Sequence, residues 1–279
     1  MLRSNTLYVD ALRAAPLDAA ASSLTSYGAF KLRVPHPEAA LHENIREAHR
    51  RVTRSGNADY TATMRSEVAR LLESRPIFWS RVWPAGVALA RFLLEEPKLV
   101  RGRTVLELGC GLGPGAVAAA IAGASDVVAT DIEPAAVEFT VQSARDNGHA
   151  LRGAAWNWND APPRALRAPF DVVLAGDVIY SEQHAPRLGR LLTDGSLLKP
   201  GGCVVFSDSL ERPYGEGHQS ELCALLAAAS YEQVLCRDLD MGDVREAAGG
   251  KAVRLLVFGQ RRTRDARAGA PKKHQSRGA

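Results

Sequence analysis

The sequence predicts an α/β protein with a doubly wound, Rossmann-like sheet of seven strands and helices on both faces. Apolar runs alternate with segments of helical periodicity across residues 104–259, which is typical of strand–helix–strand units in a parallel sheet. The first unit, residues 104–131 (TVLELGCGLGPGAVAAAIAGASDVVATD), joins a strand, a glycine-rich loop, a helix, a second strand and a final carboxylate in about thirty residues. No internal repeat or second core interrupts this pattern.

The segment before the sheet is expected to be helical from residue 61 onward. Apolar positions in residues 61–73 recur at i, i+4, i+7 and i+8, which defines one helix face, and Pro76 follows its end. A second helix is expected over residues 84–94, because it begins with a proline, whose fixed φ suits a first helical turn. Residues 31–60 are mixed and polar and predict no stable element.

The strands and four further helices of the sheet follow in alternation. The strands are short apolar runs, as expected where both faces of a parallel sheet are buried, at 105–108, 127–130, 154–158, 170–175, 203–207, 233–238 and 253–259. Helices are expected at about 116–122, 134–147, 181–192 and 217–230. The Pro-Gly-Gly run at 200–202 predicts a turn before the fifth strand.

Three regions are expected along the chain. Residues 1–60 form a partly disordered leader, residues 61–259 form the folded domain with its N-terminal helices, and residues 260–279 form a disordered basic tail. The tail holds seven Lys or Arg and one acid, a local charge of +6 against +4 for the whole chain. A solvated tail is favoured over an RNA-binding arm, although a non-catalytic RNA-binding protein stays an alternative. The leader matches an organelle transit peptide only marginally, so we expect a cytoplasmic location, with the mitochondrion as the alternative.

Composition excludes several other classes of protein. The hydrophobic fraction of 46% and the charged fraction of 24% are those of a globular domain. The longest apolar run, around residues 116–122, is far shorter than a membrane span, so no membrane association is expected. The four cysteines form no C-x-x-C pair and the seven histidines are dispersed, so no metal site is expected. We expect a monomer in a reducing compartment.

The glycine-rich unit predicts a ligand that contains adenosine. Glycines let the backbone approach a ligand closely, and Asp131, about twenty residues on, can accept hydrogen bonds from both ribose hydroxyls. The dinucleotide frame G-x-G-x-x-G/A can be placed on Gly111, Gly113 and Ala116, so an NAD(P)-dependent oxidoreductase stays an alternative. The frame E-x-G-x-G-x-G fits better, with the acid on the strand itself: Glu107, Gly109, Gly111 and Gly113.

Each of the first four expected strands ends in residues that suit ligand binding. Ligands in such sheets bind outside the carboxyl ends of the strands, near the point where the strand order reverses. The residues in question are Gly109 to Gly113 after the first strand, Asp131 after the second, Trp158 after the third, and Asp177 with Tyr180 after the fourth. We therefore expect them to surround one ligand.

Residues 78–220 resemble the seven-β-strand protein-lysine methyltransferases, which use S-adenosylmethionine. The matching segments are VWPAGVALARFLL, VLELGCGLG, TDIEP, the Trp158 position, and LAGDVIYSE with its D-x-x-Y core. The run FWSRVWPAGVALARFLLEEPKLVRGRTVLELGCG looks closest to the branch that acts on the β subunit of electron transfer flavoprotein, and SDSLERPYGEGH is similar to that branch too. The resemblance covers about half of the chain.

The resemblance implies positions for the cofactor. S-adenosylmethionine would be held by Trp83, Gly109, Gly111, Gly113, Asp131, Trp158 and Gly176. Asp131 would take the ribose hydroxyls, Trp158 would lie at the adenine, and Trp83 would close the methionine end. Glu107 would orient the glycine loop or reach the amino group of the cofactor, or it would only cap the end of its strand. Many relatives carry alanine at the position of Gly176, a change that leaves backbone contacts intact.

The resemblance also implies an acceptor site at Asp177 and Tyr180. A lysine ammonium has to lose a proton before it can attack the methyl group, and a carboxylate and a tyrosine suit its capture and alignment. The acceptor is thus expected to be a lysine of a protein substrate, with an arginine or a small amine as the alternative. Methyltransferases of nucleic-acid bases usually carry prolines between such an acid and its aromatic residue, and this D-x-x-Y run has none, so a nucleic-acid partner is not expected.

Overall fold

The computed structural model describes residues 22–36, 47–54, 60–74, 77–211, 215–244 and 251–260. The expectations for the first 21 residues and for the basic tail beyond residue 260 lie outside these ranges. The division of the chain into a leader, a domain and a tail therefore stays a prediction. Within the described ranges, the helices are too short or too polar to cross a membrane.

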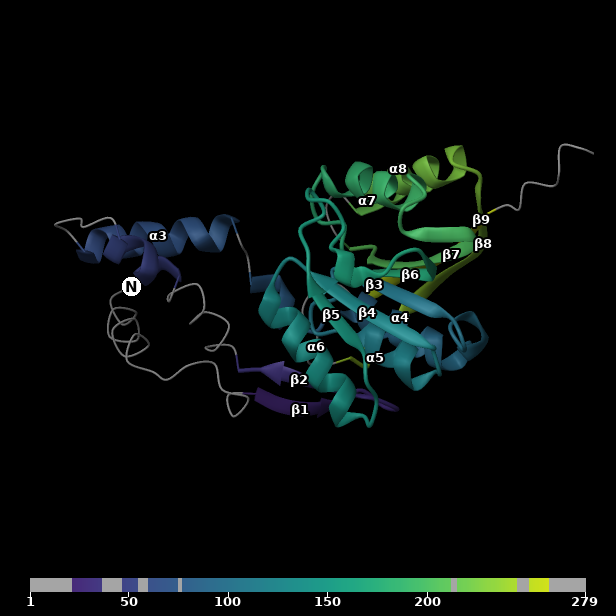
Figure 1. The fold of residues 1–279 in the computed structure, drawn as a ribbon, viewed down its shortest axis with the longest axis horizontal. Helices are drawn as coiled ribbons and strands as arrows, with labels where there is room; N and C mark the ends of the chain where they lie inside the picture. The colour runs from purple at the N-terminus through teal and green to yellow at the C-terminus, as the bar shows by residue number, and fades with distance from the viewer. Residues whose placement is uncertain are drawn as a thin grey trace, which may run out of the picture.

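A seven-stranded sheet forms the centre of the molecule, as the sequence predicts (Figure 1). Its strands are β3 (Thr104–Leu108), β4 (Asp126–Asp131), β5 (Arg152–Ala155), β6 (Phe170–Gly176), β7 (Leu198–Ser209), β8 (Tyr231–Asp240) and β9 (Ala252–Gln260). Their order is β5-β4-β3-β6-β7-β9-β8. The strands from β5 to β7 run parallel, whereas β9 runs antiparallel to β7 and β8. The order reverses at β3 and β6, which places a crevice at their carboxyl ends.

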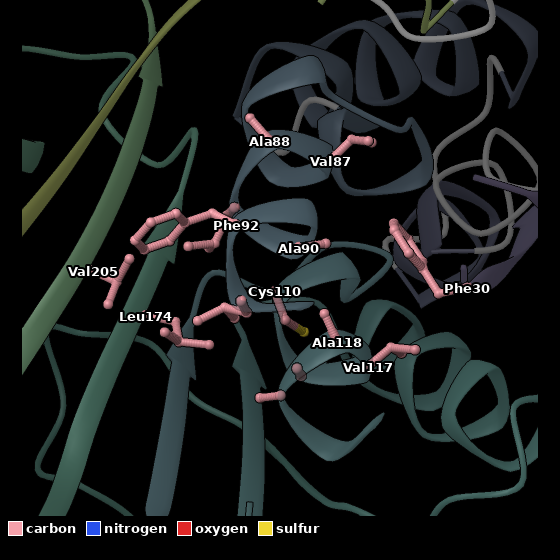
Figure 2. Packing of buried hydrophobic residues seen from close by; sticks show 14 of the residues in the cluster. Phe30, Val87, Ala88, Ala90, Phe92, Cys110, Val117, Ala118, Leu174 and Val205 are labelled. Atoms are coloured by element: carbon pink, nitrogen blue, oxygen red, sulfur yellow. The ribbon is translucent and has the colours of Figure 1, made fainter. Parts of the chain in front are cut away.

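Helices cover both faces of the sheet. The helices of the domain are α4 (Pro84–Glu95), α5 (Pro114–Ile121), α6 (Pro134–Asp146), α7 (His184–Thr193) and α8 (Gly215–Ala228). Side chains alternate along the strands, so Val105 belongs to the core under α4, α5 and α6, and its neighbour Leu106 belongs to the core under α7 and α8. Figure 1 shows the two helix layers on opposite sides of the sheet. In Figure 2, Phe92 of α4 lies over Val205 and Leu174 of the sheet.

A proline begins each of the three helices on the first face. Pro84, Pro114 and Pro134 occupy the first position of α4, α5 and α6. Proline suits this position because its φ is already helical and its missing N–H would have no partner within the helix. These prolines fix where each helix starts relative to the strand before it, and so they fix the loops at the carboxyl ends of the strands.

A β-hairpin, β1 (Ser22–Ser26) with β2 (Lys31–Pro35), packs beside α6. Arg33 of β2 donates hydrogen bonds to both carboxylate oxygens of Asp146, at 2.9 and 3.0 Å, and Phe30 is only 1% exposed in the core. Figure 1 shows the hairpin along the outer side of α6. The expectation that residues 31–60 contain no stable element is therefore wrong for β2.

The predicted helix over residues 61–73 is present as α3 (Tyr60–Ser74). Residues 47–54 are also helical, so the expectation of no stable element in residues 31–60 is wrong there too. The two segments share a small apolar cluster of Ala48, Val52, Met64, Val68 and Leu71. Figure 1 shows α3 to one side of the sheet. The short helix η2 (Ile77–Ser80) follows α3 in the chain.

Three expected elements have a boundary that differs from the structure by three residues or more. The third strand ends at Ala155 rather than at residue 158, because the chain leaves the sheet edge once its pairing with β4 ends. The Pro-Gly-Gly run lies inside the long strand β7 and not in a turn; the pairing of β6 with β7 shifts register between Phe170 and Val172, which accommodates it. Helix α7 begins at His184, three residues later than expected.

Candidate active site

A cavity of about 600 Å³ opens at the carboxyl ends of β3, β4 and β6. This volume is that of a site for a small ligand. Its walls contain all but one of the residues that the sequence singles out: Trp83, Glu107, Gly109, Gly111, Asp131, Trp158, Gly176, Asp177 and Tyr180. The structure thus brings together residues from five separate segments of the chain. Gly113 alone lies outside the cavity wall.

The glycine-rich loop passes close to the opposite wall of the cavity. Gly109 has φ +63°, a left-handed conformation, and a Cβ added there would lie 2.8 Å from Cγ1 of Val178. Gly113 also has a positive φ of +73°, but a Cβ there would lie 2.1 Å from Thr140 of α6. Gly109 is therefore required at the cavity, whereas Gly113 is required for the packing of α5 against α6.

Glu107 lies buried beneath the first turn of α5. Its Oε2 accepts a hydrogen bond from the backbone N–H of Ala116 at 2.8 Å, and this N–H is one that a helix start leaves without an internal partner. Burial raises the pKa of Glu107 to about 8, although hydrogen bonds from the N–H groups of Ala116 and Gly115 oppose the rise. The carboxyl group ties the strand end to the helix start, and it also reaches the cavity wall.

Asp131 holds the glycine loop in place from the end of β4. Its Oδ2 accepts a hydrogen bond from the N–H of Gly111 at 2.9 Å, and its Oδ1 accepts one from the N–H of Glu133 at 3.0 Å. Burial raises the pKa of Asp131, and these hydrogen bonds oppose that effect. The next residue, Ile132, is 55% exposed and lines the cavity, so an apolar surface lies beside the carboxylate. A buried acid, a close backbone and an apolar wall fit the ribose and base of an adenosine.

Asp177 sits at the turn where the chain leaves β6. Its φ is +60°, and its backbone N–H donates to the carbonyl oxygen of Ser207 at 2.8 Å. Its side chain is buried in the cavity wall, whereas Tyr180, three residues later, is 51% exposed. The acid therefore lies deep in the cavity and the phenol ring lies nearer solvent, as a channel for a long side chain requires.

Five aromatic rings form a continuous rim of edge-to-face contacts along the cavity. Neighbouring ring centroids are 5.8, 5.5, 4.3 and 6.4 Å apart in the order Trp83, Phe78, Tyr180, His184 and Trp158. The rings come from η2, the start of α4, the β6–α7 loop, α7 and the loop after β5. Aromatic faces attract cations, and they do so more strongly where water is excluded. The rim therefore suits the passage of a cationic side chain.

The sequence did not single out Phe78 and His184 of this rim, nor Trp156. Trp156 directly follows β5, is only 3% exposed, and donates its indole N–H to the carbonyl oxygen of Asp160 at 3.1 Å. The one feature of the sequence that could have identified His184 as a site residue is its position four residues after Tyr180. For Phe78 the only such feature is its place in an aromatic run. Among the described residues, His, Cys, Asp and Glu side chains form no group of three that could hold a metal ion.

Comparison with known proteins agrees with this geometry. Residues 78–213 match the model of a family described as lysine methyltransferases. The electron transfer flavoprotein β subunit lysine methyltransferase of Danio rerio is 40% identical over 115 residues, which is 41% of this chain and 43% of that protein. That of Rattus norvegicus is 33% identical over 147 residues, which is 50% of this chain and 53% of that protein. The calmodulin-lysine N-methyltransferase of Arabidopsis thaliana is 32% identical over 141 residues, 47% of this chain and 46% of that protein. The chain spans about half the length of these relatives.

Proposed function

Through residues 78–213 the chain belongs to the lysine methyltransferase family, and from this premise we propose that it transfers a methyl group from S-adenosylmethionine to a lysine side chain of a protein. The observation that carries the proposal is that one cavity holds Asp131 and the glycine loop together with Asp177 and Tyr180. A site for an adenosine and a channel for an amine thus share one space.

The residues around the glycine loop fit the cofactor. Asp131 would accept hydrogen bonds from the ribose hydroxyls, and the backbone at Gly109 would approach the ligand where a side chain has no room. Trp158 would lie at the adenine and Trp83 at the methionine end, and both line the cavity. S-adenosylmethionine supplies an electrophilic methyl group on a positively charged sulfur.

The remaining residues act on the acceptor. A lysine amine with a pKa near 10.4 has to lose a proton before its lone pair can attack, which costs about 4–5 kcal/mol at pH 7. Asp177 would attract the ammonium from the rim into the cavity. Tyr180 and Phe78, whose ring centroids lie 5.5 Å apart, would confine the side chain and align its nitrogen. No covalent nucleophile is required, so catalysis consists mostly of positioning.

We propose the β subunit of an electron transfer flavoprotein as the first substrate to test, because relatives at up to 40% identity are named for it. We propose that the chain acts as a monomer. A cytoplasmic location is proposed, with the mitochondrion as the alternative that the flavoprotein resemblance favours.

Calorimetric titration with S-adenosylhomocysteine tests the cofactor site. We expect micromolar binding by the intact chain and loss of binding in Asp131→Ala. The matched control is Asp238→Ala, which removes an exposed carboxylate that pairs with Arg254 on the far edge of the sheet, and binding should be unchanged there. If the folded chain does not bind S-adenosylhomocysteine, and reduced nicotinamide cofactor binds instead, the proposal is wrong.

Methyl transfer tests the acceptor. The chain is incubated with S-adenosylmethionine and recombinant flavoprotein β subunit, and mass spectrometry locates any methyl group. A methylated lysine supports the proposal, whereas a methylated arginine would assign the site to the alternative acceptor. Asp177→Asn should bind S-adenosylhomocysteine as the intact chain does and transfer methyl groups far more slowly, because it keeps the size of the side chain and removes its charge.

A further inference from the structure

His184 is an ionisable group of the cavity to which the proposed function assigns no role. It is the first residue of α7 and lines the cavity. Its ring stands almost perpendicular to that of Tyr180, at an interplanar angle of 88° and a centroid distance of 4.3 Å. The same ring makes an edge-to-face contact with Trp158, with ring centroids 6.4 Å apart. The imidazole therefore contacts both the residue proposed for the acceptor and the residue proposed for the cofactor.

Two backbone groups contact Nδ1 of this imidazole and favour opposite tautomers. Nδ1 lies 3.0 Å from the carbonyl oxygen of Val178, whereas the backbone N–H of Tyr180 points to Nδ1 as a donor at 3.4 Å. A carbonyl oxygen can only accept a hydrogen bond, so the shorter contact requires a hydrogen on Nδ1. The longer contact exceeds the ordinary range of about 2.7–3.2 Å for such a bond. With its hydrogen on Nδ1, the neutral ring carries its basic lone pair on Nε2.

From this geometry we infer that His184 is a further catalytic residue, which accepts the proton that the substrate ammonium has to lose. The inference rests on the proposed function. In this step one N–H bond of the ammonium breaks and its electron pair stays on the lysine nitrogen. The proton adds to the lone pair of Nε2 and gives an imidazolium. The half-exposed mouth at Tyr180 then lets the proton pass to solvent.

The chemistry of imidazole favours this assignment over a carboxylate base. General-base catalysis is most efficient when the pKa of the base lies near the working pH. Model-peptide pKa values are about 6.5 for histidine and about 3.9 for aspartate. The two groups then divide the work: the Asp177 carboxylate attracts the ammonium and stabilises the imidazolium, and His184 takes the proton.

Several titratable groups line the same cavity as His184. They are Glu107 on β3, Asp131 and Glu133 after β4, Asp177 after β6, Arg81 before α4, and Arg187 one turn further along α7. The ionised carboxylates favour the imidazolium and the two arginines oppose it, whereas Glu107, whose pKa burial raises to about 8, is neutral near pH 7. The phenol of Tyr180 and the thiol of Cys110 also line this cavity.

The first test is the pH dependence of methyl transfer to recombinant flavoprotein β subunit by the full chain and by His184→Asn. The asparagine amide nitrogen occupies the place of Nδ1, so the variant keeps the hydrogen bond to Val178 and loses the base. We expect the rate of the intact chain to fall as pH drops through the pKa of the imidazole. We expect the pH–rate profile of His184→Asn to lack this fall. The rate of the variant should be about 100-fold lower near pH 7 and should approach the rate of the intact chain as pH rises. Equal profiles would overturn the inference.

The second test needs no acceptor. Long-range ¹H–¹⁵N correlation spectra of the full chain with S-adenosylhomocysteine report which ring nitrogen of His184 carries the hydrogen. A neutral ring protonated on Nδ1 supports the inference, and one protonated on Nε2 overturns it. His149→Asn, which alters a half-buried histidine in the loop between α6 and β5, identifies a second ring signal and should leave the rate unchanged.

The two tests separate this inference from the proposed function. Binding of S-adenosylhomocysteine together with lysine methylation, but with equal pH profiles for the two proteins, would leave the proposed function intact and remove only the role of His184. Absence of both cofactor binding and methylation would remove the proposed function, and the role of His184 would fall with it.

Discussion

Replacement of Glu107 by glutamine should destabilise the folded chain at pH 5 and stabilise it at pH 8.5. The carboxyl group is fully buried and accepts the N–H of Ala116 at 2.8 Å, with a second hydrogen bond from the N–H of Gly115. Glutamine has the same shape, but its NH₂ group would face one of these two N–H donors. The variant therefore loses one hydrogen bond and also loses the ability to ionise.

The size of the effect follows from the pKa of Glu107, which burial raises from 4.5 to about 8. Below pH 4.5 the group is protonated in both the folded and the unfolded chain, so the raised pKa costs nothing. Between pH 4.5 and 8 the unfolded chain loses the proton and the folded chain keeps it, so stability falls as pH rises. The full loss is about 5 kcal/mol, at about 1.4 kcal/mol per pKa unit. The lost hydrogen bond costs the glutamine variant about 1–2 kcal/mol at every pH.

Glu107→Gln should therefore be less stable than the intact chain by up to about 1 kcal/mol at pH 5 and more stable by about 3 kcal/mol at pH 8.5. Urea unfolding followed by tryptophan fluorescence at half-unit pH steps measures both free energies. Glu138→Gln, which changes an exposed glutamate of α6, serves as the control and should follow the intact chain at each pH. If the Glu107→Gln curve runs parallel to that of the intact chain, the carboxyl group ionises as readily in the folded state as in the unfolded state, and the reasoning is refuted.

Two further predictions concern Gly86 of α4 and Asp171 of β6. Gly86→Ala should destabilise the domain by about 1–3 kcal/mol in urea unfolding, because its Cβ would lie 2.8 Å from Cγ of the rigid Pro114 ring. This clash should outweigh the higher helix propensity of alanine. A stabilised variant would contradict the prediction. Burial raises the pKa of Asp171, but hydrogen bonds from Thr104 and Lys199 outweigh it and lower the pKa to about 2. The stability that these hydrogen bonds supply is present above pH 3.8 and is lost as pH falls toward 2. Asp171→Asn should therefore cost about 1 kcal/mol at pH 7 for this partly exposed group, the same at pH 5, and less at each step below pH 3.8 in the same assay.

Much of the sheet and the cavity follows from the sequence, because both depend on local patterns. Apolar runs identify strands that are buried on both faces, and the carboxyl ends of parallel strands meet at one edge of a sheet. Asp131 and Asp177 are therefore placed in one cavity by chain order alone, although they lie on different strands. The glycine loop is equally local, since Gly109 has to adopt a left-handed backbone beside Val178.

The hairpin of β1 and β2 could not be predicted in the same way. Its strands have five residues each, too short for a clear period. What holds it in place is distant in the chain: Arg33 bonds to Asp146, and the N–H of Lys31 donates to the side chain of Asn147, 116 residues away. Such pairs leave no signal in a single sequence, because neither partner is unusual in its own segment.

The aromatic rim was missed for a related reason. Phe78 and Tyr180 touch across about a hundred residues of chain, and the contact depends on how η2 lies against the β6–α7 loop. Sequence patterns indicate which residues face a core, but they do not report which exposed rings meet. Trp158 shows the same limit, since it lines the cavity from a loop after β5 and not from the strand end that the sequence predicted.

The backbone conformation of Asp177 indicates that the turn itself does not require an acid at this position. The reason for an aspartate here therefore lies in its side chain. A φ of +60° is strained for a residue with a Cβ, at a cost of about 1–3 kcal/mol, although aspartate tolerates it better than most. Glycine would make the same turn without strain, and Gly176 stands directly before it. The hydrogen bond from its N–H to Ser207 would remain with either residue, because it involves only backbone atoms. A strained carboxylate where glycine would suffice, buried in the wall of a cavity with Tyr180 at its mouth, is expected where the charge itself acts on a ligand.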